Sequence, residues 1–246
     1  MVNQKARKTS STKNDTLEPK KSSSPKKKFK IAGIIVGVLF LLLLLIGATG
    51  SVVPEYSLED LVPVKKDAIE FSRPEQWEDA SFAENLVKDF GLEVSNASIY
   101  GDKVVKDKND QYDVENAAVI FGLASNETTD LAIVKRPEFK AKFEELMNGQ
   151  LKEENFKSGS CKTVTNFGKN FNYDYNNIPV SVAIKLNCGL TDSQKDKFNA
   201  DSIELRMAIM IANDGKTYMY ALMASDKSWE KNEPVYFQMM KDLKGI

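Results

Sequence analysis

The longest apolar stretch of the chain covers residues 31–50, IAGIIVGVLFLLLLLIGATG, which contain no charged residue and no Asn or Gln. A helix of about 20 residues, rising about 1.5 Å per residue, covers the ~30 Å hydrocarbon core of a bilayer. Inside lipid, each backbone N–H and C=O must be paired within its own segment. The stretch therefore predicts one transmembrane helix, and we expect the lipid bilayer to be a partner of the chain.

A cleaved signal peptide is the alternative interpretation of this stretch, because Ala48 and Gly50 form a small-x-small site before Ser51. The basic region of about 30 residues and an apolar run longer than the ~7–15 residues of a signal core argue against cleavage. We therefore expect an uncleaved single-pass anchor.

The two sides of the predicted helix differ in charge. Residues 1–30 contain ten Lys or Arg against Asp15 and Glu18, so they carry +8, and the net charge of −1 leaves −9 for the rest. Basic residues beside a span stay on the cytoplasmic side. We expect a cell-membrane protein whose N-terminus is cytoplasmic and whose C-terminal domain is extracellular.

Residues 1–30 are rich in Lys, Ser and Thr and poor in apolar side chains, which predicts a disordered cytoplasmic tail. The basic residues next to the span are interpreted as a topology signal, with contact to anionic headgroups or to nucleic acid as the alternatives. We expect no nucleic-acid partner. The cluster consists of Lys26, Lys27, Lys28 and Lys30.

Residues 51–66 contain two prolines and show no clear period, which predicts a short stalk. Residues 67–246 are long enough for one domain with a sizeable core. Their hydrophobic pattern predicts a strand at 68–72, a helix at 75–90, a strand at 92–100, an exposed loop at 102–113, a buried strand at 117–123 and a helix at 137–154.

The two cysteines of the chain frame a predicted hairpin. Cys161 precedes one β-rich stretch and Cys188 ends another, and pairing about a turn near 174–175 places them opposite each other. Two cysteines in an oxidising extracytoplasmic space are best interpreted as one disulfide. The alternative, a reactive thiol, needs a basic or cationic neighbour that the sequence does not identify.

The C-terminal stretch predicts a second hairpin and a closing helix. Strand patterns at 203–212 and 216–224 flank Asn213-Asp214-Gly215, a hairpin turn signal, and apolar positions from 235 to 243 have helical spacing. The order of elements predicts an α+β domain with a mostly antiparallel sheet and helices packed on it.

These patterns resemble the PsbP-like fold. The residues that carry the resemblance are the opening strand at 69–74 with Trp77 close behind, the Asn-Asp-Gly hairpin, the strand at 216–220, and Ser228-Trp229 before a final helix. Proteins with this fold include photosystem subunits, a nuclear import factor that binds a small GTPase, and bacterial envelope lipoproteins. The resemblance implies a binding or assembly module without shared catalytic residues. The membrane helix and basic tail make the envelope proteins the nearer analogy.

The chain contains no histidine, which excludes His-based acid–base catalysis, His-dependent nucleophiles and most zinc sites. Asp107, Asp110 and Asp113 lack the Gly and Glu of a calcium loop, so we expect a solvated loop and no metal site. We expect no cofactor. The carboxylate pairs at 144–145 and 153–154 lie on the polar side of the predicted helix.

Four aromatic residues are candidates for lining a ligand groove, although aromatic residues on strands more often belong to a core. They are Tyr173, Tyr218, Tyr220 and Trp229. The leading hypothesis is a membrane-anchored, non-catalytic binding or envelope-assembly module with an envelope protein or a glycan as partner. The alternatives are a membrane-tethered, carboxylate-dependent hydrolase of cell-surface polymers and a signal-transmitting protein whose basic tail is the effector.

Overall fold

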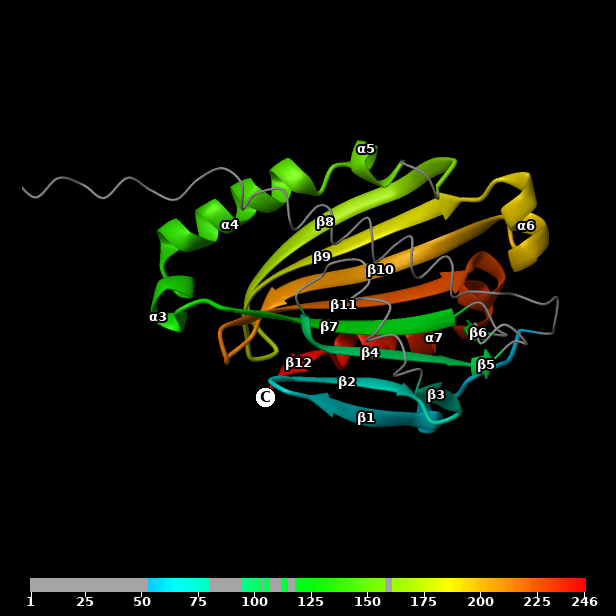
Figure 1. The fold of residues 1–246 in the computed structure, drawn as a ribbon, viewed down its shortest axis with the longest axis horizontal. Helices are drawn as coiled ribbons and strands as arrows, with labels where there is room; N and C mark the ends of the chain where they lie inside the picture. The colour runs from blue at the N-terminus through cyan, green and yellow to red at the C-terminus, as the bar shows by residue number, and fades with distance from the viewer. Residues whose placement is uncertain (1–52, 80–93, 103, 107–111, 115–117, 158–160) are drawn as a thin grey trace, which may run out of the picture.

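A computed structural model describes residues 53–79, 94–102, 104–106, 112–114, 118–157 and 161–246 (Figure 1). The predicted tail with Lys26, Lys27, Lys28 and Lys30 and the predicted span at 31–50 lie outside these ranges. Within them, each helix is too short or too polar to cross a bilayer. The transmembrane helix therefore stays a prediction.

An antiparallel sheet of seven strands forms the centre of the domain, with neighbours in the order β3-β4-β7-β11-β10-β9-β8 (Figure 1). In chain order the strands are β3 (Trp77–Asp79), β4 (Val94–Asp102), β7 (Ala118–Thr128), β8 (Thr163–Tyr175), β9 (Ile178–Gly189), β10 (Ser202–Ile211) and β11 (Lys216–Ser225). A three-stranded sheet consists of β1 (Leu61–Lys66), β2 (Ile69–Pro74) and β12 (Lys244–Gly245), with β2 in the middle. β5 (Val104–Lys106) and β6 (Tyr112–Val114) form a small ladder.

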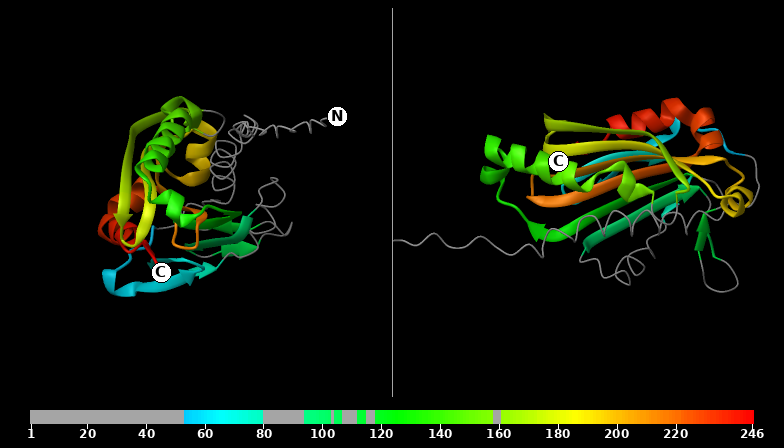
Figure 2. Two further views of the ribbon diagram at one scale, coloured as in Figure 1. Left: turned by 90° about the vertical axis from the view of Figure 1, so that its left-hand side faces the viewer. Right: turned by 90° about the horizontal axis from the view of Figure 1, so that it is seen from above.

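Helices lie on both faces of the large sheet (Figure 2). In chain order they are η2 (Leu58–Asp60), α3 (Leu131–Val134), α4 (Pro137–Gln150), α5 (Glu153–Phe156), α6 (Asp192–Phe198) and α7 (Asp226–Lys241). The side chain of Ser225 caps α7 by accepting a bond from the N–H of Ser228. Asn232 has non-helical φ and ψ of −117° and 18°, and Pro234 follows, so α7 is kinked there.

Two hydrophobic cores lie on opposite faces of the sheet, because successive residues of a strand point to opposite sides. On β10, Leu205 and Met207 belong to the core that contains Phe143 of α4, which we call the α4-side core. Met210 of the same strand belongs to the core that contains Tyr236 of α7, the α7-side core. Burial on both faces explains the nearly continuous apolar sequences of β10 and β11.

The α+β architecture confirms the predicted fold class. The strands predicted at 68–72, 92–100 and 117–123 correspond to β2, β4 and β7, and the helix predicted from 137 is α4, which ends at Gln150 before the short α5. Both predicted hairpins form. The turn between β8 and β9 lies at Asn176 and Asn177, two residues later than expected, and both residues have positive φ.

The stalk prediction for residues 51–66 is wrong over its described part, which includes η2 and β1. Residues 61–66 form β1, which pairs with β2 from Leu61 opposite Pro74 to Lys66 opposite Ile69. Pro63 has no backbone N–H to donate to a neighbouring strand. It is tolerated because β1 is an edge strand of its sheet, where the backbone on the outer side is not paired within this sheet. The domain therefore begins before residue 61.

The helix predicted at 75–90 is wrong at its start, where residues 77–79 form β3 opposite β4. Nη1 of Arg73 donates to the carbonyl oxygens of Pro74, Glu75 and Trp77 at 2.9, 3.0 and 2.7 Å, which stabilises an extended turn in place of a first helical turn. Residues 80–90 lie outside the described residues.

Two further boundaries differ from the prediction. The loop expected at 102–113 contains the last residue of β4 and the β5–β6 ladder, with Val104 opposite Val114. The closing helix begins at Asp226, nine residues before Val235, the first of the apolar positions that predicted it, because Ser225 supplies an N-cap that the apolar spacing did not reveal.

Candidate functional site

The four aromatic residues proposed for a groove do not come together. Tyr218, Tyr220 and Trp229 are 2%, 0% and 6% exposed and pack in the α7-side core. Tyr173 packs against the α4-side core on the other face of the sheet, and its hydroxyl donates to Glu144. Burial and this carboxylate raise the pKa of Tyr173 to about 12. The alternative interpretation of these aromatics, as core residues, is the correct one.

The cysteines form the predicted disulfide. Sγ of Cys161 and Sγ of Cys188 are 2.02 Å apart, and both residues are buried in the α4-side core. Cys188 lies opposite Val164 in the β8–β9 ladder, so the bond fastens the segment before β8 to the end of β9. The chain has no free cysteine, which leaves no reactive thiol.

The carboxylate pair at 153–154 lies on the surface, and in the pair at 144–145 Glu145 is exposed and Glu144 is half-buried. Glu153 pairs with Lys157 at 2.7 Å and Glu154 with Lys152 at 3.7 Å, both with largely exposed side chains. Asp107 and Asp110 lie outside the described residues, and Asp113 is on β6. Within the described ranges no three acidic or cysteine side chains gather in a way that could hold a metal ion.

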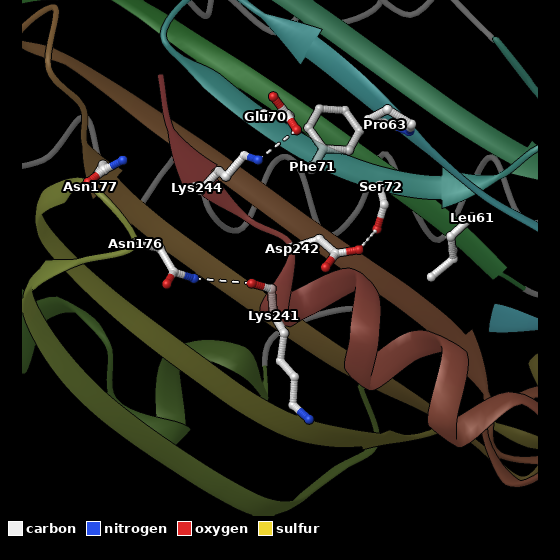
Figure 3. A pocket seen from close by; sticks show the side chains of 10 residues that line it. All are labelled: Leu61, Pro63, Glu70, Phe71, Ser72, Asn176, Asn177, Lys241, Asp242 and Lys244. Atoms are coloured by element: carbon white, nitrogen blue, oxygen red, sulfur yellow. Dashed lines mark hydrogen bonds and ion pairs between the residues drawn. The ribbon is translucent and has the colours of Figure 1, made fainter. Parts of the chain in front are cut away.

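A pocket of about 440 Å³ lies between the β1–β2 hairpin, the β8–β9 turn and the end of α7 with β12 (Figure 3). None of its residues was a candidate site in the sequence. Polar and charged side chains predominate, with apolar ones along β1. The lining consists of Leu61, Pro63, Glu70, Phe71, Ser72, Asn176, Asn177, Lys241, Asp242 and Lys244.

Strand register places an acidic side chain of the pocket between two lysines. Glu70 of β2 lies opposite Lys65 on one side and Lys244 on the other. Its carboxylate is 2.9 Å from Nζ of Lys244 and 3.7 Å from Nζ of Lys65. The bond from Lys244 and the charges of both lysines lower the pKa of Glu70. This carboxylate is therefore ionised at neutral pH.

The second acid of the pocket, Asp242, closes the C-terminal end of α7. Its carboxylate accepts a hydrogen bond from Oγ of Ser72 (Figure 3) and another, at 2.7 Å, from Nε2 of Gln238. Each of its oxygens thus has a donor, one from β2 and one from α7 itself. Asp242 joins the small sheet to the helix and holds that wall of the pocket in place.

The β8–β9 turn forms the opposite wall. Nδ2 of Asn176 donates to the carbonyl oxygens of Lys241 and Leu243, at 3.1 Å each, which satisfies two carbonyl groups where α7 ends. The N–H of Gly245 donates to the carbonyl of Asn176 at 2.9 Å, and Nδ2 of Asn213 donates to the carbonyl of Asn177 at 3.0 Å. These bonds connect the turn to β12 and to the β10–β11 hairpin, so the pocket is preformed.

This arrangement is suited to binding by hydrogen bonds. A glycosidase-type general acid needs a carboxyl group whose pKa is raised, whereas the pKa of Glu70 is lowered. Figure 3 shows the side chain of Lys241 extending away from the other lining residues. The pocket thus offers amide groups, paired charged groups and an apolar strand edge.

No protein-family model matches the sequence, and no curated protein matches it. Several solved structures are similar. The PsbP protein of the cyanobacterium Synechocystis sp. PCC 6803 is 11% identical to this chain, over 80% of this chain and 98% of that protein, with a TM-score of 0.43. LpqN, involved in cell envelope biogenesis of Mycobacterium tuberculosis, is 11% identical over 78% of this chain and 98% of LpqN, with a TM-score of 0.36. A mutant of the protein Mog1 is 12% identical over 74% of this chain and 93% of Mog1, with a TM-score of 0.37. These similar structures include a PsbP protein, the family whose motifs the sequence resembles.

Proposed function

We propose that the chain is a non-catalytic binding or envelope-assembly module, held outside the cell membrane by the helix at 31–50. The observation that carries the proposal is the buried disulfide between Cys161 and Cys188. Such bonds persist in oxidising extracytoplasmic compartments and are rare where thiols are kept reduced. The excess of positive charge at residues 1–30 supports the same orientation.

The pocket is the proposed binding surface. Its carboxylates already accept bonds from neighbouring side chains, an arrangement that favours recognition over acid–base chemistry. Pro63 is exposed at its apolar edge, and Asn176 and Asn177 bring amide groups to its other side. A partner with many hydrogen-bonding groups beside an apolar surface suits this lining, such as a glycan or an extended peptide of an envelope protein.

Site-specific photocrosslinking in living cells tests the proposal. A photoreactive phenylalanine replaces Pro63 in the full chain, and the matched control places it at Ile133, which is 43% exposed on α3 and does not line the pocket. We expect a discrete glycan or protein adduct at position 63 and none at 133. No adduct at 63, or equal labelling at both positions, would contradict binding through the pocket.

The location is tested separately with a maleimide reagent of high mass. In intact cells, we expect a cysteine that replaces Tyr175, a residue that is 55% exposed, to be labelled, and we expect a cysteine introduced into residues 1–30 to be protected until the membrane is opened. A cysteine at position 175 that is labelled only after the membrane is opened would contradict an extracytoplasmic domain.

A further inference from the structure

The segment that follows the predicted membrane helix is fixed on α7 (Figure 2). Nζ of Lys231 donates to the carbonyl of Val53 at 2.8 Å, and Nδ2 of Asn232 donates to the carbonyl of Pro54 at 3.0 Å. In return, the N–H of Tyr56 donates to Oδ1 of Asn232 at 2.8 Å. We call these three bonds the α7 latch.

The kink of α7 makes the latch possible. Asn232 leaves the helical conformation, and its side-chain amide donates to the carbonyl of Pro54 and accepts from the N–H of Tyr56. A peptide group of a neighbouring strand makes the same pair of hydrogen bonds in a sheet. The same Nδ2 also donates to the carbonyl of Ser228 at 3.2 Å. Asn232 is 1% exposed, so little water reaches its side of the latch to compete for these bonds.

The ring of Tyr56 reinforces the latch from inside the domain. Its centroid lies 5.8 Å from that of Trp77 and 6.4 Å from that of Tyr236 in the α7-side core. Its hydroxyl donates to Oδ2 of Asp102 at 2.7 Å, and both residues are buried. Residues 53–56 are therefore part of the folded domain, where the sequence predicted a stalk.

The latch shortens the tether between the domain and the membrane. The predicted span ends at Gly50, three residues before Val53, a distance of at most about 10 Å in an extended chain. A free stalk over all sixteen residues from 51 to 66 would reach up to about 55 Å. The folded domain is thus held close to the lipid surface at the residues of the latch.

We propose that the N-terminal half of α7 is the membrane-facing surface of the domain, in contact with lipid headgroups; this inference rests on the anchor of the proposed function. The exposed charges of this half are mixed, Lys227 and Lys231 against Glu230 and Glu233. The short tether, and not charge attraction, brings this surface of the domain to the lipid headgroups. The contact is therefore expected to persist at high salt and in bilayers without anionic lipid.

Fluorescence quenching by labelled headgroups tests the inference on the full chain in liposomes. Glu230→Cys places a dye on the exposed surface beside the latch, and Tyr175→Cys places one beside the pocket, at a residue that is 55% exposed. We expect several-fold stronger quenching at 230 than at 175, unchanged by high salt. Equal quenching, or stronger quenching at 175, in protein that carbonate does not extract would overturn this inference alone. Extraction by carbonate would overturn the proposed anchor and this inference with it.

Release of the latch provides the second arm. Asn232→Ala removes two of its three bonds, and we expect quenching at 230 to fall, while the matched control Asn170→Ala, at an exposed asparagine of β8, leaves it unchanged. Because Asn232 is buried and its variant is prone to misfolding, an independent variant inserts six Gly and Ser residues between Gly50 and Ser51. This insertion touches no residue of the latch and should lower quenching by lengthening the tether. Quenching that stays the same with the longer tether would overturn the inference.

Discussion

The phenol oxygen of Tyr220 is a buried polar group whose removal should stabilise the domain. The side chain is fully buried, and Oη has no hydrogen-bonding partner among the described residues. Burial and the charge of Asp242 raise the pKa of this phenol, so it stays neutral. The ring itself packs 5.4 Å from that of Phe71, centroid to centroid, and Tyr220→Phe preserves this contact.

The expected magnitude follows from two opposing contributions. An unpaired buried hydroxyl costs about 1–3 kcal/mol relative to water. Removing one oxygen leaves a void of about 15 Å³, which costs about 0.4 kcal/mol. We therefore expect Tyr220→Phe to stabilise the domain by about 1 kcal/mol, which raises Tm by about 2–4 °C for a domain of this size.

The matched control is Tyr236→Phe, in the same core. Its Oη lies 2.7 Å from Oγ of Ser228, both residues are buried, and loss of this bond should cost about 1–2 kcal/mol. Trp77 and Trp229 both pack against Tyr236, so tryptophan emission during thermal unfolding of the full chain in detergent reports on this core. A fall in Tm for Tyr220→Phe similar to that of the control would refute the reasoning, because it would require a partner for the Tyr220 hydroxyl.

Three further predictions concern the disulfide, β12 and the pocket acid. Reduction of the disulfide, whose cysteines are 27 residues apart, should lower the free energy of unfolding by about 3 kcal/mol in urea titrations; an unchanged midpoint would contradict this. A Cβ on Gly245 would overlap the carbonyl oxygen of Asn177, so Gly245→Ala should destabilise the domain by about 1–3 kcal/mol. The control is Gly149→Ala on α4, where a Cβ meets open space and Ala has the higher helix propensity, so this variant should stabilise the domain by about 0.5–1 kcal/mol. Lys244 lowers the pKa of Glu70 below its ordinary 4.5, so the ionised carboxylate contributes stability that is fully present above pH 4.5. As the pH falls below 4.5, the unfolded chain binds more protons at this residue than the folded chain does, and the contribution is lost. Glu70→Gln should therefore make the free energy of unfolding depend less on pH below 4.5, as measured by urea titrations at several pH values.

Local sequence signals were sufficient for the elements whose partners are close in the chain. The Asn-Asp-Gly turn specifies the β10–β11 hairpin, and positive φ at Gly215 supplies the conformation that this turn requires. The pairing of the two cysteines, 27 residues apart, likewise followed from the hairpin that places them opposite each other. In both cases a hairpin determines the contact, so strand patterns and turn chemistry are enough.

The misjudged segment at 61–79 depends on contacts that local patterns do not contain. Trp77 has helical spacing to later apolar residues, but Arg73 binds the carbonyls of this turn and keeps the chain extended. The pocket is also a tertiary product, because Glu70 meets Lys244 only through β12. Asn176 was visible in the sequence as a turn residue, yet its role at the end of α7 depends on a residue 65 positions away.

One helix connects the proposed anchor with the proposed binding pocket. Lys231 in the latch and Lys241 at the pocket are ten residues apart, which is at most about 15 Å along a helix. Together with a tether of about 10 Å and the length of the Lys231 side chain, this would keep the pocket on the order of 30 Å from the bilayer surface. If both proposals hold, the partner is itself a membrane component or belongs to the envelope layer next to the membrane. A crosslinked partner restricted to more distant layers would be incompatible with the latch.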